Sequence, residues 1–379
     1  MFYISKVTPL LFILAFLNLI VSIFLKINGA DYVYVGLNGV FGFIGLTLIG
    51  AMYQIIPNSQ QQKLKFEKLS YLVFILAVIF SIFLWINNLM VSSFIYLFLI
   101  ILFIFNIIPV VKNVKPITIK YLAVSLIYFV LSSVFLVLSS FNIVPVQLAI
   151  HTLTVGVMIN AVLGVQTAWF PLFFMQNLDF QMSNRIFYFI QISTVLVLFS
   201  FFSMNYSLIG LSAVIEILSL ILFVLLMVVI VRQGKMLQKI PYAVKLFSTG
   251  HLFLFLGLLT AFFIAIFKKF EFLPIHLDFM IYGFAFFTIL GGVLHLTPRI
   301  LWNMVSVRKA QEGKQVPQLN KLLNGETVDK ITYFLIGLFG ISLFLEILLK
   351  SNMYWGLFLI GAIFTFLKFF WDFYRLYKY

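Results

Sequence analysis

The stretch that decides the fold is residues 274–301, which read PIHLDFMIYGFAFFTILGGVLHLTPRIL. Besides two histidines, its only charged side chains are Asp278 and Arg299. A membrane-spanning helix needs about 20 predominantly apolar residues, so this segment predicts a span. Ionisable groups inside a bilayer are costly and are functional candidates by default, so the polar residues of this span need an explanation.

Similar apolar runs fill the rest of the chain. Of its 379 residues, 63% are hydrophobic and 9% are charged, whereas an ordinary globular domain has about 25% charged residues. This composition excludes a soluble enzyme, a disordered tail and a nucleic-acid binder. We predict an all-α polytopic membrane protein whose twelve transmembrane helices cover roughly residues 7–28, 33–56, 69–90, 92–111, 117–141, 146–172, 186–204, 207–231, 241–267, 274–301, 331–349 and 353–374.

The basic residues predict the orientation of these spans. With a cytoplasmic N-terminus, 21 of the 25 Lys and Arg residues fall in cytoplasmic segments and four on the opposite side. Positive charge collects in cytoplasmic loops. The split therefore predicts that both termini are cytoplasmic and that the chain lies in the cell inner (plasma) membrane.

A glycine–proline pattern divides the chain into three units. The motif Gly-x7-Gly-x6-Pro occurs in the second, sixth and tenth predicted spans. We therefore expect one transmembrane domain, 1–379, built from four-helix units at about 1–116, 117–240 and 241–379. Glycine lets either another helix or a flat ligand approach closely. The motif residues are Gly42, Gly50 and Pro57, then Gly156, Gly164 and Pro171, and then Gly283, Gly291 and Pro298.

Two histidines occupy similar depths in two of these spans. His151 and His276 precede their motif prolines by 20 and 22 residues, which is about 30–33 Å of helix. A pair of imidazoles at one level can ligate iron or copper. Hydrogen bonding of both histidines as ordinary interfacial residues is the alternative.

Two acidic residues are further candidates within the spans. Asp278 lies two residues from His276 and is expected to point to another side of the helix. Glu216 is either protonated, held by a neighbour such as Gln191, or part of a proton path. Glu346 and Lys350 are four residues apart and predict an ion pair on a helix surface.

The tenth span has a distinctive order of polar and small residues. It resembles helix X of the haem–copper oxidase catalytic subunit (subunit I), and the stretch from His151 through Gly164 is similar to segments of the NnrS-type nitric-oxide response proteins. The family has twelve spans in three pseudo-repeats. The residues that carry the resemblance in the tenth span are His276, Asp278, Gly283, Gly291, Gly292, His295 and Pro298.

The resemblance implies one haem pocket and not a complete oxidase. Asp278 stands where the family has the second histidine of a pair, and the span 186–204 has no histidine for a copper centre. What remains is a b-type haem between the sixth and tenth spans, beside Gly156 and Gly283. His276 would be its proximal ligand, and His151 either its sixth ligand or a distal residue. Copper is the alternative metal.

Three functions stay open on this evidence. The first is a haem protein related to the oxidase subunit, acting in the response to nitric oxide or oxygen or in respiratory electron transfer. The second is a secondary transporter, and the third is a cofactor-free scaffold subunit of a respiratory complex. The expected partners are the bilayer and either respiratory subunits or further copies of the chain, without nucleic acid. Proton transfer through Glu216 and Asp278 is a further expectation, and whether the protein is an enzyme is left open.

Overall fold

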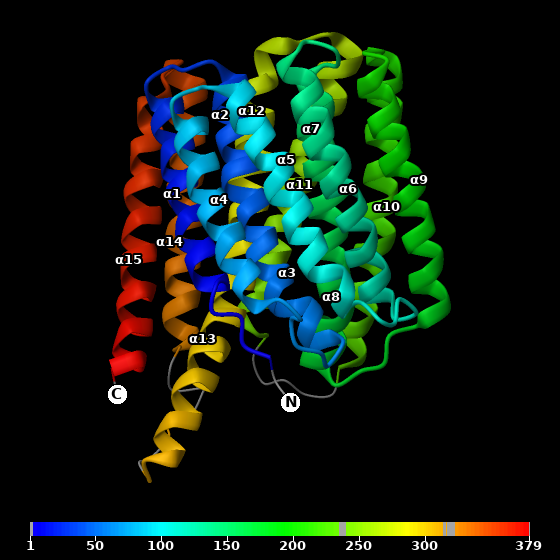
Figure 1. Cartoon of the computed structure of the whole chain (residues 1–379). Coiled ribbons are helices and arrows are strands. Elements are labelled where there is room, and N and C mark those ends of the chain that lie inside the picture. The colour runs from blue at the N-terminus through cyan, green and yellow to red at the C-terminus, as the bar shows by residue number, and fades with distance from the viewer. Residues whose placement is uncertain (1–2, 235–239, 314–315, 317–322, 379) are drawn as a thin grey trace.

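A computed structural model describes residues 3–234, 240–313, 316 and 323–378, and the regular structure in these ranges is helical. Within this part of the chain, twelve helical segments are long and apolar enough to cross a membrane. They run side by side along one direction and form a single bundle (Figure 1). The predicted all-α architecture with twelve spans is therefore confirmed, and the protein is a multi-pass membrane protein.

Nine of the twelve spans are built on one regular α-helix each. Short 3₁₀ turns, η2 (Ile108–Val110), η4 (Phe270–Phe272) and η7 (Asn352–Tyr354), adjoin three of the spans. The nine helices are α1 (Thr8–Ile27), α4 (Glu67–Trp85), α5 (Leu89–Ile107), α6 (Ile117–Ser140), α9 (Phe180–Phe202), α10 (Tyr206–Gln233), α11 (Tyr242–Phe267), α14 (Gly325–Leu349) and α15 (Trp355–Lys378).

The other three spans contain an eight-residue π-helical segment between two α-helical parts. The wider turn of a π-helix changes the direction of the side chains that follow it, and such segments are frequent at functional sites. The second span is α2 (Tyr32–Leu37), η1 (Asn38–Gly45) and α3 (Leu46–Ser59); the sixth is α7 (Val146–His151), η3 (Thr152–Ile159) and α8 (Asn160–Phe174); the tenth is α12 (Leu273–Leu277), η5 (Asp278–Ala285) and α13 (Phe286–Gln311).

These three interrupted spans form the centre of the bundle. In their apolar windows, 89%, 78% and 61% of the residues are buried, against at most 56% in the other nine spans. The segment η1 contacts both η3 and η5. The core of the molecule is therefore the place where the second, sixth and tenth spans meet.

The third span is shorter than the predicted run 69–90. Its helix α4 ends at Trp85, and Asn87 adopts a left-handed backbone conformation with φ 57°. The side chain of Asn88 then caps α5 by accepting a hydrogen bond from the Val91 amide at 3.1 Å. Asparagine tolerates both roles, so local turn chemistry ends the helix although the apolar run continues.

Two other helices extend beyond their predicted limits. The sequence predicts the seventh span over 186–204, but α9 begins at Phe180 because the Asp179 carboxylate caps its first turn. The tenth was expected over 274–301, but α13 continues to Gln311 and projects from one end of the bundle (Figure 1). Hydropathy marks the apolar part of a helix and not its polar ends.

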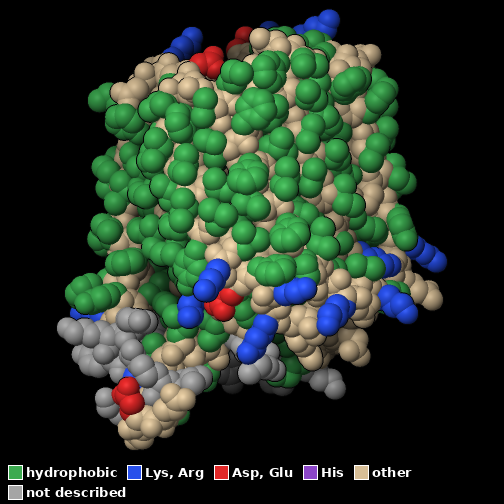
Figure 2. All heavy atoms as spheres, viewed as in Figure 1, with side chains coloured by type: hydrophobic (Ala, Val, Ile, Leu, Met, Phe, Trp, Pro, Cys, Tyr) green, Lys and Arg blue, Asp and Glu red, His purple; other side chains and the backbone are tan. Residues whose placement is uncertain are grey.

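Both ends of the chain lie at the same end of the bundle, as an even number of spans requires (Figure 1). A broad band of hydrophobic side chains covers the visible face, and Lys and Arg side chains gather beside the end that carries the termini (Figure 2). A surface of this kind is suited to the hydrocarbon core of a bilayer with a basic face at one interface.

Candidate functional site

His151 closes the short helix α7, where the sixth span enters its π-helical segment. Its Nδ1 lies 2.7 Å from the carbonyl oxygen of Gln147, one turn earlier. Its ring stacks on Phe201 of α9, with 3.7 Å between the ring centroids. These two contacts fix both the position and the rotation of the half-buried imidazole.

His276 lies in α12, at the corresponding end of the tenth span. Its Nδ1 is 2.9 Å from the carbonyl oxygen of Gly257 in α11. The imidazoles of His276 and His151 are both half-buried. The two histidines thus lie at corresponding ends of the sixth and tenth spans, and their sharing of one ligand stays a prediction.

The hydrogen bonds define which nitrogen of each ring is free. A carbonyl oxygen only accepts, so Nδ1 of each ring carries the proton and donates it. In a neutral imidazole this leaves the lone pair on Nε2. Within the described residues, Nε2 of His151 and of His276 has no protein hydrogen-bond partner. A carbonyl that binds one ring nitrogen and leaves the other free is the usual support of a metal-ligating histidine.

The two glycines predicted beside a cofactor pack against aromatic side chains. A Cβ atom on Gly156 would lie 2.6 Å from the Tyr128 ring in α6, and one on Gly283 would lie 2.7 Å from the Phe253 ring in α11. Both distances are shorter than van der Waals contact. Close packing of neighbouring helices thus accounts for both glycines, and their predicted contact with a cofactor stays a prediction.

A cluster of buried charges joins three spans beside His276. Nζ of Lys26 in α1 lies 2.7 Å from Oδ1 of Asp278 and 2.9 Å from Oε1 of Glu346 in α14. The Trp355 indole nitrogen donates to the other Glu346 oxygen at 2.5 Å. Asp278 thus reaches α1 while His276 reaches α11, as their two-residue spacing predicts.

This cluster corrects the predicted surface pair of Glu346 with Lys350. Glu346 is buried and binds Lys26, whereas Lys350 is exposed. Lys26 is one of the four basic residues that the charge split assigns to the outer side, and the sequence does not predict it as a site residue. The sequence nevertheless contains a signal for this residue, because Lys26 is the single charged side chain in the run 7–28. One lysine and two carboxylates carry a net charge of −1 unless a proton or another cation joins them.

Glu216 has a partner other than the expected Gln191. It lies buried in the middle of α10, and the Ser193 hydroxyl of α9 donates to its Oε2. Gln191 instead donates to Oδ1 of Asn160 at 2.6 Å. The reason is the one-turn periodicity of α9, which directs positions 191 and 193 to different neighbours.

The two remaining histidines lie away from this pair. His251 is buried in α11 and uses Nδ1 to bind the Phe247 carbonyl at 2.8 Å. His295 packs on the ring of Trp169, with centroids 4.3 Å apart, and binds the Arg299 guanidinium. The contact with Trp169 packs the tenth span against the sixth.

Among the described residues, no three His, Cys, Asp or Glu side chains converge on a point where they could hold a metal ion. In the described part of the chain, the protein would therefore supply at most two such side chains to one metal ion. A haem iron needs one or two of these, since the porphyrin supplies its other four ligands.

The twelve spans and the ionisable groups inside the bundle define a polytopic membrane protein with a candidate ligand site in its core. No family model matches the sequence. The chain is 42% identical over 319 residues to an uncharacterized protein of Aquifex aeolicus (strain VF5), and the match covers 83% of each chain. It belongs to the same family as that protein.

Proposed function

We propose that the chain is a membrane haem protein related to the haem–copper oxidase catalytic subunit and closest in character to the NnrS-type proteins. The observation that carries the proposal is the pair His151 and His276 at corresponding ends of the sixth and tenth spans, each with Nδ1 held by a carbonyl and Nε2 free. One b-type haem would lie between the sixth and tenth spans.

The two histidines have different roles in this proposal. His276 would be the proximal ligand, because the Gly257 carbonyl of another helix holds its ring. His151, with its ring held by Phe201, would be either the sixth ligand or a residue beside a bound gas. A bound haem b would supply a diatomic-gas ligand site or a one-electron carrier. Copper held by the same two imidazoles is the alternative metal.

The proposed role is in the response to nitric oxide or oxygen, or in respiratory electron transfer. Partners in that role are other respiratory subunits or further copies of the chain. The intramembrane carboxyl groups Asp278 and Glu216 are the candidates for a proton path, since both are buried within helices that cross the bundle.

The three-unit organisation is part of the proposal. The π-helical segments begin 19, 19 and 20 residues before the motif prolines. In each unit, the two motif glycines also pack against residues seven apart in the first helix of that unit. The contacts are Gly42 with Asn18, Gly50 with Leu11, Gly156 with Tyr128, Gly164 with Tyr121, Gly283 with Phe253, and Gly291 with Leu246.

The proposed orientation has both termini in the cytoplasm and places the chain in the cell inner membrane. It is supported by the Lys and Arg side chains that gather beside the end of the bundle with the termini (Figure 2). The positive-inside rule assigns such a basic end to the cytoplasm.

A secondary transporter is the second candidate function. The observation that favours it is the Lys26–Asp278–Glu346 cluster, because buried ion pairs at interrupted helices are typical of the coupling sites of transporters. A cofactor-free scaffold is the third candidate, and neither of these two would contain haem.

An absorption spectrum separates these functions. We expect the full chain, purified in detergent from haem-replete cells, to show a Soret band that shifts on reduction and on addition of nitric oxide. A colourless protein without iron or copper would contradict the haem proposal. Flux assays in proteoliposomes would then test the transporter against the scaffold.

A further inference from the structure

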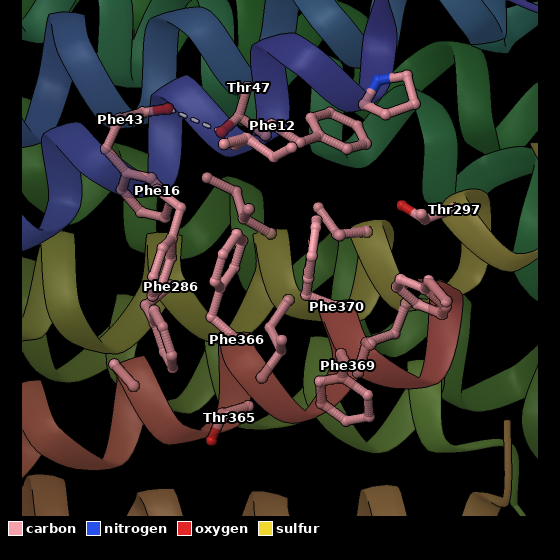
Figure 3. A pocket seen from close by; sticks show the side chains of 18 of the residues that line it. Phe12, Phe16, Phe43, Thr47, Phe286, Thr297, Thr365, Phe366, Phe369 and Phe370 are labelled. Atoms are coloured by element: carbon pink, nitrogen blue, oxygen red, sulfur yellow. Dashed lines mark hydrogen bonds between the residues drawn. The ribbon is translucent and has the colours of Figure 1, made fainter. Parts of the chain in front are cut away.

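An apolar cavity of about 260 Å³ lies between the first, second, tenth and twelfth spans. Its walls are largely phenyl rings, and Figure 3 shows Phe16, Phe286, Phe366 and Phe370 around the open space. An apolar cavity of about 150 Å³ stays free of water and binds benzene. A cavity of this size and lining therefore fits a hydrocarbon ligand and not a water cluster.

The cavity is long and follows the membrane normal. On the tenth span, its lining extends from Phe286 to Leu301, and on α15 from Ala362 to Tyr374. The distance along the helix from Phe286 to Thr297 is about 16 Å at 1.5 Å per residue. One leaflet of the hydrocarbon core is about 15 Å thick. The cavity thus spans one leaflet, from the interface to the middle of the membrane.

One end of the cavity is closed and the other opens to the bilayer. The rings of Phe16 and Phe366 stack at 4.2 Å between centroids and join α1 to α15 at the deep end. Toward the end of the bundle with the termini, Phe370 and Tyr374 are 49% and 47% exposed. A molecule from the surrounding leaflet can therefore enter sideways near the interface.

A single unpaired hydroxyl marks the shallow end. The hydroxyls of Thr47 and Thr365 in the lining are bound by backbone carbonyls at 2.8 Å. The Thr297 hydroxyl is the one buried side-chain polar atom without a partner among the described lining residues, and Thr297 is only 7% exposed. Figure 3 shows its oxygen directed toward the rings. An unpaired buried hydroxyl is unfavourable, so an acceptor on the ligand would complete the site.

We propose that this cavity binds an acyl chain of a bilayer phospholipid, with the ester carbonyl accepting a hydrogen bond from Thr297. The chain would run from the interface to the membrane middle along the phenyl rings. The site calls for a ligand with one hydrogen-bond acceptor at one end and an apolar body as long as one leaflet. An esterified fatty acid has both features. The site is independent of any haem ligand.

Photolabelling tests the proposal directly. The full chain is reconstituted in phosphatidylcholine vesicles that contain a trace of the same lipid with a diazirine midway along one acyl chain. After irradiation, we expect adducts concentrated on cavity residues such as Ile13, Leu290 and Phe366. Labelling spread evenly over exposed lipid-facing residues, such as Ile192 and Phe199 of α9, would overturn the proposal.

Two variants and a control sharpen the test. Val293→Phe fills the cavity and should reduce its adducts several-fold, with α9 labelling unchanged. Thr297→Val should weaken retention of the lipid roughly 2- to 10-fold, which corresponds to one hydrogen bond. Thr365→Val is the matched control, because its hydroxyl is already bound by Gly361, and it should leave retention unchanged. An isoprenoid quinone extracted from the purified chain in place of phospholipid would also overturn the proposal.

Discussion

At the scale of single residues, burial separates the half-buried His151 and His276 from the buried His251. Both donate Nδ1–H to a carbonyl and leave Nε2 without a protein partner among the described residues. His251 has the same internal bond, but its Nε2 is enclosed without a partner. The Nε2 atoms of these three histidines can therefore be compared as ligand positions within one protein.

The first prediction concerns loss of the proximal ligand. We expect His276→Ala to abolish the Soret band, because the iron loses its strongest protein ligand. His151→Ala should retain the haem and change its spin state, since only the sixth position is altered. Absorption spectra of the purified variants measure both effects. His251→Gln is the control, and a spectrum that changes only in this control would contradict the assignment.

The second prediction concerns the buried charge cluster. Lys26→Met leaves the carboxylates of Asp278 and Glu346 without their cation and should destabilise the protein by about 3–5 kcal/mol. The triple variant Lys26→Met, Asp278→Asn, Glu346→Gln removes every charge and should recover most of this loss. Thermal unfolding in detergent provides the comparison.

Lys350→Met is the control for the cluster. Lys350 is exposed near the same end of α14, so its replacement should change stability by no more than about 0.5 kcal/mol. Equal effects of Lys26→Met and Lys350→Met would show that the buried pairs do not stabilise the fold.

Sequence alone identifies part of this residue-scale chemistry. The depth of His151 and His276 follows from counting residues to a proline. The partners of Lys26 and Glu216 do not, because they depend on the rotation of each helix about its axis. The π-helical segments change that rotation within the second, sixth and tenth spans. The pairing of Lys26 with Asp278 joins residues 252 positions apart, and no local pattern specifies it.

At the scale of the elements, glycine determines how closely the central helices approach their neighbours. Gly283 lies under the Phe253 ring, whereas Gly337 and Gly340 in α14 have open space where a Cβ would lie. The same residue type thus has a packing role in one helix and none evident in another. The motif Gly-x7-Gly-x6-Pro distinguishes the two in the sequence.

The third prediction follows from this difference. Gly283→Ala places a Cβ about 2.7 Å from the Phe253 ring and should cost about 1–3 kcal/mol, the usual range for an overpacked core. Gly340→Ala should be neutral or slightly stabilising, because alanine is the better helix former. Unfolding temperatures in detergent test the pair, and equal values would argue against close packing at Gly283.

Helix number follows from hydropathy, and helix ends do not. Twelve apolar runs predict twelve spans because the bilayer imposes a minimum length on each. The end of α4 at Trp85 is followed by the left-handed Asn87, and the start of α9 at Phe180 depends on the cap Asp179. The π-helical segments have no hydropathy signal, and only the recurrence of the glycine motif points to those three spans.

At the scale of the whole molecule, the even number of spans places both termini at one end, and the basic side chains gather there (Figure 2). The chain contains no cysteine, so any introduced cysteine is a unique reporter. This property permits a direct test of the proposed orientation.

The fourth prediction concerns that orientation. Lys112→Cys should react with a membrane-impermeant maleimide only after the cell membrane is opened, because its loop would be cytoplasmic. Lys269→Cys, in the loop after α11, should react in intact cells. The reverse pattern would invert the proposed topology, and it would leave the haem proposal untouched.

The most direct test of the central proposal is the haem content of the purified full chain. Pyridine haemochrome analysis, with iron and copper determined on the same sample, measures it against protein concentration. The account predicts about one b-type haem per chain, and its loss in His276→Ala. A protein from haem-replete membranes that is folded, colourless and free of iron would contradict it.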